Sequence, residues 1–244
     1  MKINKITGEN FITHCNKSSF EINFNDNINI ITGSNGSGKT LLIELMYNLL
    51  KCGEIPWDDD KLDKFKMYLS EGDIMDNIIE FGEDMKVKNW NAKYKSKSIK
   101  FISEITQLPE LNDMCPVDFM ELMINPNPKR LIQFPPDFLD TVNPYLSNSK
   151  LEYSDEYGLQ LTKSKKLSNG ETRLLEILTA AITTEDILFI DIPEISLHID
   201  IQRHLLDWIE KWNKNLQVIL CTHSPSVVDG RWDLCTDLTE LFGD

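Results

Sequence analysis

A run of eight residues near the N-terminus constrains the fold of this chain more than any other feature. The run reads Gly33-Ser34-Asn35-Gly36-Ser37-Gly38-Lys39-Thr40 and matches the pattern GxxxxGK[ST]. An apolar stretch over 28–31 precedes it, and residues 40–50 have the apolar spacing of a helix. A glycine-rich loop between a strand and a helix N-terminus cradles phosphate with its backbone N–H groups. The run therefore predicts a phosphate-binding loop in a parallel α/β fold.

The residues of this loop also indicate what it binds. The N–H groups that would hold the phosphates belong to Ser34, Asn35, Gly36, Ser37 and Gly38. We expect Lys39 to pair with the β- and γ-phosphates of a nucleotide, and the hydroxyl of Thr40 to coordinate Mg²⁺. The predicted ligands are therefore ATP and Mg²⁺.

A second apolar strand ends in an acid. Residues 187–190 are Ile-Leu-Phe-Ile, and Asp191 follows them. Parallel α/β sheets bind their ligands at the carboxyl ends of the strands. Asp191 is therefore expected to be a partner of Mg²⁺, either as a direct ligand or through a water in its second coordination shell. An apolar strand that ends in Asp is common by itself, but behind a phosphate-binding loop it indicates a nucleotide site.

Two further motifs lie in the C-terminal half. Residues 167–171 read Leu-Ser-Asn-Gly-Glu and precede a predicted helix over 171–182. Ser168 is placed to cap that helix, and Gly170 leaves room for a phosphate at the helix N-terminus. His223 follows the predicted strand 217–221. Taken singly, these residues have the simpler interpretations of a helix cap and a structural histidine.

Together, in this order, the four motifs resemble those of the ABC (ATP-binding cassette) ATPases. The signature LSGGQ of that class appears here as LSNGE. Ser168 precedes Asp191 by 23 residues and Asp191 precedes His223 by 32, which is similar to the spacing in the class. The resemblance implies a P-loop NTPase head in which Ser168 and Gly170 contact the γ-phosphate bound by the opposite subunit. It also implies that His223 senses the γ-phosphate.

Residues 191–198, Asp-Ile-Pro-Glu-Ile-Ser-Leu-His, resemble the D-E-P-E-x-x-L-H stretch of the soluble, SMC-like or OLD-like branch, which includes the ATPase subunits of the Septu and PARIS anti-phage systems. By this resemblance 196–198 form the D-loop at the dimer interface. One residue departs from the pattern, because Ile192 stands where the class has its catalytic glutamate. An aliphatic side chain cannot accept a proton. Either Glu194, two residues further on, takes the catalytic role, or the head binds ATP and hydrolyses it slowly. His223 is the other candidate catalytic residue.

The predicted architecture is one ABC-type ATPase domain over 1–244, with a mostly parallel central sheet, N-terminal antiparallel strands and a helical insert or lid over 57–150. Within the insert, 57–80 is expected to be helical and 99–103 a strand. A hairpin is expected over 151–153 and 158–161. The class has a metal-contacting glutamine after its middle strand. Gln107 is the candidate here, with a solvent-exposed glutamine as the equal alternative.

Charge and composition limit the kinds of molecule that this chain can bind directly. The chain has 39 acidic and 25 basic side chains, a net charge of −14, which repels phosphate backbones. The run 86–100 carries six lysines and no acid, and we interpret it as a solvated surface hairpin rather than a nucleic-acid site. No apolar stretch approaches 18 residues, so we expect no membrane association and a cytoplasmic location. Five scattered cysteines fit a reducing compartment and disfavour zinc.

The sequence therefore predicts an ATPase that forms a homodimer or higher homo-oligomer around ATP. Because the chain leaves no room for a nuclease domain before Asp244, we expect it to regulate a separate effector protein, such as a nuclease, in a DNA-directed or anti-phage complex. Nucleic acid would then be reached through the complex. Two alternatives stay open: a non-hydrolysing scaffold that ATP holds together, and the ATPase subunit of a transporter.

Overall fold

The computed structural model describes residues 1–11, 19–55, 62–72, 74–82, 86–103, 134–147, 149–154, 158–162 and 167–243. Its centre is a parallel sheet in the order β12-β3-β11-β10-β7. The strands are β3 (Ile28–Thr32), β7 (Ile99–Ile102), β10 (Ile187–Asp191), β11 (Gln217–Cys221) and β12 (Cys235–Asp237). All neighbouring pairs in this sheet are parallel, which confirms the predicted fold class.

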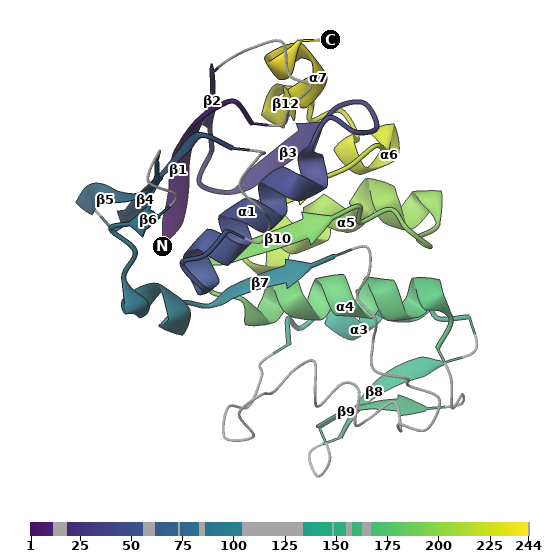
Figure 1. Ribbon diagram of the computed structural model, residues 1–244. Coiled ribbons are helices and arrows are strands. Elements are labelled where there is room, and N and C mark those ends of the chain that lie inside the picture. The colour runs from purple at the N-terminus through teal and green to yellow at the C-terminus, as the bar shows by residue number, and fades with distance from the viewer. Residues whose placement is uncertain are drawn as a thin grey trace.

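The central strands are apolar at nearly every position because both faces of the sheet are covered. In β10, Leu188 and Ile190 pack with α4 (Asn169–Thr183) and α5 (Ile199–Trp212). The alternate residues Ile187 and Phe189 pack on the other face with α1 (Lys39–Lys51). Figure 1 shows α1 and α4 on opposite sides of β7 and β10. The helix predicted over 199–212 and the strands over 187–190 and 217–221 are confirmed.

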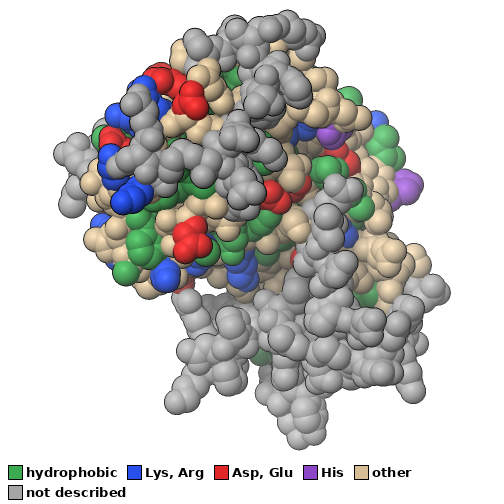
Figure 2. All heavy atoms as spheres, in the orientation of Figure 1, with side chains coloured by type: hydrophobic (Ala, Val, Ile, Leu, Met, Phe, Trp, Pro, Cys, Tyr) green, Lys and Arg blue, Asp and Glu red, His purple; other side chains and the backbone are tan. Residues whose placement is uncertain are grey.

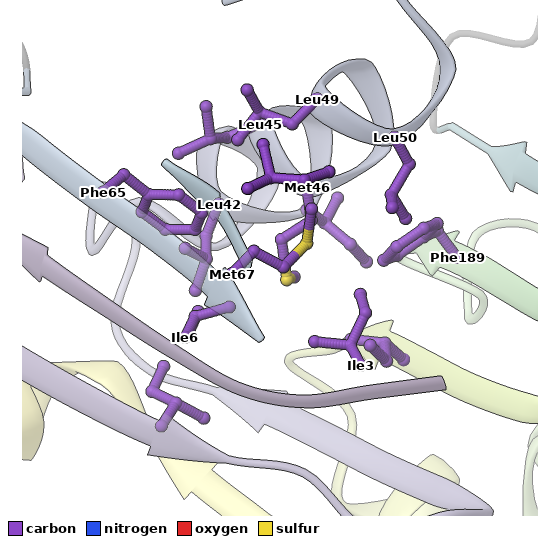
Figure 3. Packing of buried hydrophobic residues seen from close by; sticks show 14 of the residues in the cluster. Ile3, Ile6, Leu42, Leu45, Met46, Leu49, Leu50, Phe65, Met67 and Phe189 are labelled. Atoms are coloured by element: carbon purple, nitrogen blue, oxygen red, sulfur yellow. The ribbon is translucent and has the colours of Figure 1, made fainter. Parts of the chain in front are cut away.

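A second sheet is antiparallel and lies over α1. Its order is β2-β1-β4-β5-β6, formed by β1 (Lys2–Glu9), β2 (Ser19–Asn23), β4 (Lys64–Glu71), β5 (Ile74–Phe81) and β6 (Val87–Lys88). Figure 3 shows Ile3 and Ile6 of β1 and Phe65 and Met67 of β4 pointing toward Leu42 of α1 and its neighbours. The predicted N-terminal antiparallel strands are therefore confirmed, and one apolar cluster joins both sheets.

The helical conformation predicted for 57–80 is wrong for the described part of that stretch. Phe65, Met67 and Leu69 alternate with more exposed residues along β4. This period of two places the apolar side chains on one face of a strand. Lys64 and Lys66 beside the apolar Phe65 and Met67 obscured this alternation in the sequence.

The lysine-rich run 86–100 does not form the predicted surface hairpin. It contains β6, the 3-10 helix η2 (Ala92–Ser96) and the first residues of β7. Tyr94 of η2 is 2% exposed and joins the apolar cluster around α1. The run therefore connects the two sheets, and its aromatic residues Trp90 and Tyr94 pack in the apolar cluster around α1.

Smaller elements complete the described chain. They are α3 (Phe138–Val142), η3 (Asn143–Tyr145), β8 (Lys150–Ser154), β9 (Gly158–Thr162), α6 (Pro225–Val228), η4 (Trp232–Leu234) and α7 (Leu238–Phe242). The hairpin predicted before the LSNGE motif is present as β8 and β9. Within the described ranges, no helix combines the length and apolar character needed to cross a membrane. Within the predicted lid, residues 104–133, which include Gln107, lie outside the described residues.

Candidate nucleotide site

The glycine-rich loop lies between β3 and α1, as its sequence predicts. Gly36 and Gly38 have φ angles of 82° and 87°, which only glycine adopts without strain. Gly38 is the N-cap of α1, so the loop amides precede a helix of 13 residues. The amide of Ser34 donates to the hydroxyl of Thr239 at 2.7 Å, so α7 holds the beginning of the loop. No sequence pattern indicated that contact.

The ammonium group of Lys39 lies over the loop. Its Nζ donates to the carbonyl oxygens of Gly33 and Ser34 at 2.9 and 2.8 Å. Lys39 is 5% exposed, and this burial lowers its pKa below the usual lysine value of 10.5. The carboxylate of Asp191 opposes part of that shift. A cation with its donors directed at the loop is placed to bind the anion that the loop would hold.

The structure brings Thr40 and Asp191 together from opposite ends of the sequence. The Thr40 hydroxyl at the start of α1 donates to Oδ2 of Asp191 at the end of β10, at 2.9 Å. Both groups are oxygen ligands of the kind that Mg²⁺ prefers. Among the described residues, no group of three or more His, Cys, Asp and Glu side chains could hold a metal ion. Thr40 and Asp191 therefore fit a Mg²⁺ ion that takes its remaining ligands from phosphate and water.

Ile192 has an unusual backbone. Its φ is 46°, in the left-handed region that a β-branched residue rarely adopts. The backbone is held on both sides, because its N–H donates to the carbonyl of Cys221 at 2.9 Å and its carbonyl accepts from Arg173 at 3.3 Å. The same guanidinium donates to the carbonyl of Asp191 at 2.9 Å. The residue in the position of the catalytic glutamate is thus fixed in a strained conformation.

Arg173 was not among the predicted site residues. It is 7% exposed on α4 and pairs with Glu176, which is 6% exposed. The signal in the sequence was this pair of charges, three residues apart, within the apolar-rich helix. Besides Asp191 and Ile192, Arg173 donates to the carbonyl of Ser103 beyond β7 at 3.0 Å. One buried side chain therefore joins the LSNGE helix to the ends of two central strands.

Glu194 faces the loop that carries His223. Its carboxylate accepts from the Thr222 hydroxyl and from the His223 backbone N–H, both at 2.8 Å. The imidazole of His223 is exposed. The geometry therefore gives Glu194 a positioning role for the His223 loop, and the catalytic role proposed for its carboxylate stays a prediction.

Ser168 and Gly170 lie at the N-terminus of α4. Ser168 caps the helix, and Glu171 completes a capping box with Oε2 accepting from the Ser168 N–H at 2.7 Å. Gly170 lies against the backbone of Ser196 so closely that a Cβ atom would overlap its carbonyl oxygen. In Figure 1 this end of α4 lies on the same side of the molecule as the carboxyl ends of β7 and β10. Ser168 has described contacts with Glu171 and Thr172, and Gly170 with Ser196; no described contact joins either residue to the phosphate-binding loop.

A hollow of about 220 Å³ separates the start of that loop from the His223 loop. Its lining includes Gly33, His223, Val228, Trp232 and Asp237. Trp232 is 60% exposed, which is unusual for so large an apolar side chain. The predicted His223 and the phosphate-binding loop are therefore neighbours across an open space.

The lysines of the antiparallel sheet do not form an unbalanced basic surface. Figure 2 shows basic and acidic side chains next to one another on the side of this sheet. The pairs are Lys5 with Glu21, Lys64 with Glu9, Lys66 with Glu80, and Lys93 with Glu71. These contacts neutralise much of the charge that a nucleic acid would need.

Comparison with known proteins agrees with this geometry. A family model described as "AAA domain, putative AbiEii toxin, Type IV TA system" matches residues 118–229, the part that contains Ser168, Asp191 and His223. No curated protein matches the sequence.

Three solved structures share the fold at low sequence identity. An SMC head bound to the C-terminal winged-helix domain of ScpA is 13% identical with a TM-score of 0.58, covering 93% of this chain and 91% of its own. The SMC head domain from Thermotoga maritima is 14% identical with a TM-score of 0.53, covering 94% and 92%. A protein described as an ABC transporter ATP-binding protein, from Pyrococcus furiosus, is 14% identical with a TM-score of 0.53, covering 98% and 100%. The chain therefore has the fold and the motif order of an ABC-class ATPase head.

Proposed function

We propose that this head binds ATP with Mg²⁺, closes on a second copy of itself around the nucleotide, and hydrolyses it slowly. The observation that carries the proposal is the 2.9 Å hydrogen bond from the Thr40 hydroxyl to the Asp191 carboxylate, beside the Lys39 ammonium. Lys39, Thr40 and Asp191 come from two distant segments of the chain and meet at the phosphate-binding loop. Their chemistry is that of a Mg²⁺-nucleotide site.

Each residue of the site has a defined task in this proposal. The amides of 34–38 and the Lys39 ammonium bind the phosphates, since both offer positive partial or full charge. Thr40 and Asp191 hold Mg²⁺, which when bound neutralises charge on the phosphate oxygens. His223 lies across the hollow from Gly33 and would be placed to sense the terminal phosphate.

The second copy is proposed from the position of α4. Ser168 and Asn169 are exposed at its N-terminus, and helix N-termini bind anions. The described contacts of this end are within its own segment, with Ser147 through Glu171, and with Ser196. The N-terminus of α4 carries the signature motif but has no described contact with the phosphate-binding loop of its own chain. It is therefore suited to bind a nucleotide held by another subunit.

Slow hydrolysis follows from Ile192 and Glu194. Ile192 cannot act as a base, and both carboxylate oxygens of Glu194 accept hydrogen bonds from the His223 loop. The same observation favours a second candidate function, a scaffold assembled by ATP without turnover. Steady-state phosphate release with and without a partner protein separates the two.

A separate effector protein is proposed because the similar SMC head is bound to a domain of another protein, ScpA. The family description names a toxin of a toxin–antitoxin system, which supports a role in a defence complex. Nucleic acid would be contacted through that complex, since the chain has a net charge of −14.

Light scattering tests the proposal directly. The mass should double on addition of ATP with Mg²⁺, and it should stay at the monomer value with ADP or with ATP and EDTA. Calorimetry should show one ATP bound per chain. A mass that does not respond to ATP, although ATP binds, would remove the dimer and leave the nucleotide site.

A further inference from the structure

Two loops at the carboxyl edge of the central sheet are held together by a pair of side chains. One loop is the turn 192–198 after β10, and the other is 222–225 after β11. The first of the two side chains is Glu194, which accepts hydrogen bonds from Thr222 and from the His223 N–H.

The second side chain is Gln202, on the first turns of α5. Its Nε2 donates to the carbonyl oxygens of Leu197 at 2.9 Å and of Glu194 at 3.4 Å. Its Oε1 accepts from the Ser224 hydroxyl at 2.7 Å. Gln202 is half-buried, and its donor and its acceptor are both directed at backbone or side-chain groups of the two loops.

The contacts close into a ring around His223. The Ser224 N–H donates to the Thr222 hydroxyl oxygen at 2.9 Å, and that hydroxyl donates to Glu194. The residues before and after His223 are thereby fixed to the 192–198 turn, while the imidazole itself is exposed. Connected hydrogen bonds of this kind hold a geometry better than isolated ones.

The exposed parts of the ring are the parts that a partner or a nucleotide could contact. Ser196 is exposed with a φ of 62°, so the 192–198 turn projects a strained tip into solvent. Movement of this tip would shift Leu197 and, through Gln202, Ser224. A partner that displaces the turn at Ser196 would therefore also displace the His223 loop. Gln202 would transmit this movement, although its described hydrogen bonds involve neither the Ser196 side chain nor the imidazole.

We propose that Gln202 is a positioning residue that couples the 192–198 turn to the His223 loop, so that the two loops move as one unit. The proposal deepens the proposed function, because it makes the response of His223 depend on contacts made at Ser196. Gln202 contacts no residue of the phosphate-binding loop among the described hydrogen bonds, so nucleotide affinity should not depend on it.

Hydrogen exchange of the nucleotide-free protein tests the coupling without requiring ATP. In Gln202→Leu, peptides covering 192–198 and 222–226 should both exchange about 3- to 10-fold faster, because each loop loses its bond to the amide. Gln202→Glu retains an acceptor for Ser224 and loses the donor to Leu197, so only 192–198 should accelerate. Arg203→Gln, on the exposed side of the same turn of α5, is the control and should match wild type.

A kinetic measurement separates positioning from simple stability. With a melting temperature near the wild-type value, Gln202→Leu should lower kcat several-fold and leave KM for ATP within about twofold. Wild-type exchange in both loops, or faster exchange throughout the protein, would overturn the proposal. Failure of wild-type protein to bind ATP would instead defeat the proposed function, and the exchange result would still decide the coupling.

Discussion

Gly170 and Ser196 are in direct backbone contact, since a Cβ atom on residue 170 would overlap the carbonyl oxygen of Ser196. The contact joins the first turn of α4 to the tip of the 192–198 turn. Glycine at this position therefore has a structural reason within one chain, separate from any phosphate. If glycine is needed for the contact with Ser196, an added methyl group should destabilise the monomer. If it is needed only to leave room for a phosphate, the monomer should not be destabilised.

Gly170→Ala should destabilise the monomer by about 1–3 kcal/mol, because backbone must move to admit the methyl group. The sign is informative, since replacing glycine by alanine inside a helix usually stabilises by about 1 kcal/mol. Denaturant unfolding without nucleotide measures the change. Asn169→Ala, at the exposed neighbouring position, should stay within about 0.5 kcal/mol of wild type. A gain in stability for Gly170→Ala would show that the backbone contact is not tight.

Arg173→Met should cost about 3–5 kcal/mol of unfolding free energy, because it removes the cation paired with buried Glu176 and a donor to three backbone carbonyls. Its effect should be larger than that of the surface variant Arg203→Met on α5. Chemical denaturation of both proteins makes the comparison. Equal stability of the two variants would mean that the Arg173 network contributes little to the fold.

The features that could be predicted from the sequence are those that depend on the pattern of neighbouring residues. The phosphate-binding loop, the buried strand ending at Asp191 and the amphipathic helix 199–212 each depend on neighbouring residues, and the structure has all three. The strands β4 and β5 were predicted as helix, because charged residues on the outer face masked the alternation of Phe65 and Met67. When charged and apolar residues are mixed in this way, the sequence fits the helical period of 3.6 residues as well as the strand period of two.

The contacts around the site could not be predicted in the same way. Thr40 and Asp191 are 151 residues apart, and the sequence joined them only through the rule that parallel sheets bind ligands at the carboxyl ends of their strands, without predicting their hydrogen bond. Arg173 and Gln202 act on backbone carbonyls, which carry no sequence signature. Their roles depend on how α4 and α5 pack on the sheet, so they appear only once the tertiary structure is known.

Lys39→Ala should abolish ATP binding, because it removes the only side-chain cation of the loop. Titration calorimetry with ATP and Mg²⁺ measures the affinity. Lys64→Ala, on the distant antiparallel sheet, is the matched control and should bind like wild type. Since Lys39 also bonds to Gly33 and Ser34, the variant needs a melting curve to show that it is folded. Retained affinity in a folded Lys39→Ala protein would exclude this loop as the nucleotide site.

Ser168→Arg should leave ATP binding by the monomer nearly intact and eliminate ATP-dependent association, because the signature serves the nucleotide of the opposite subunit. The variant also loses a helix cap, which costs about 0.5–2 kcal/mol. Ser168→Ala loses the same cap without adding bulk, so it isolates that effect. Light scattering in ATP and Mg²⁺ reads out the dimer. Wild-type association by Ser168→Arg would contradict the signature assignment.

Ile192 stands where the ABC class has its catalytic glutamate, so a general base is missing at this position. Wild-type turnover should be slow, and Ile192→Glu should raise it, because a positioned general base contributes typically about 10²- to 10⁴-fold. Two features of the structure limit the gain. The φ of 46° at this position suits an unbranched side chain better than isoleucine, but a new carboxylate also needs partners or water. Ile192→Gln has nearly the same shape without the charge, and it should leave turnover low.

Glu194→Gln separates the two roles open to Glu194. The amide oxygen still accepts from the His223 N–H, so the loop should remain in place, as hydrogen exchange can verify. If Glu194 supplies the base, turnover falls with the loop intact, because an amide cannot take a proton at neutral pH. If it only positions His223, turnover stays at the wild-type rate while Glu194→Ala lowers it. We expect a partial fall, since both carboxylate oxygens of Glu194 already accept hydrogen bonds from the His223 loop. Rapid wild-type hydrolysis that Glu194→Gln does not change would require a base from outside this segment, with His223 or a partner subunit as the source.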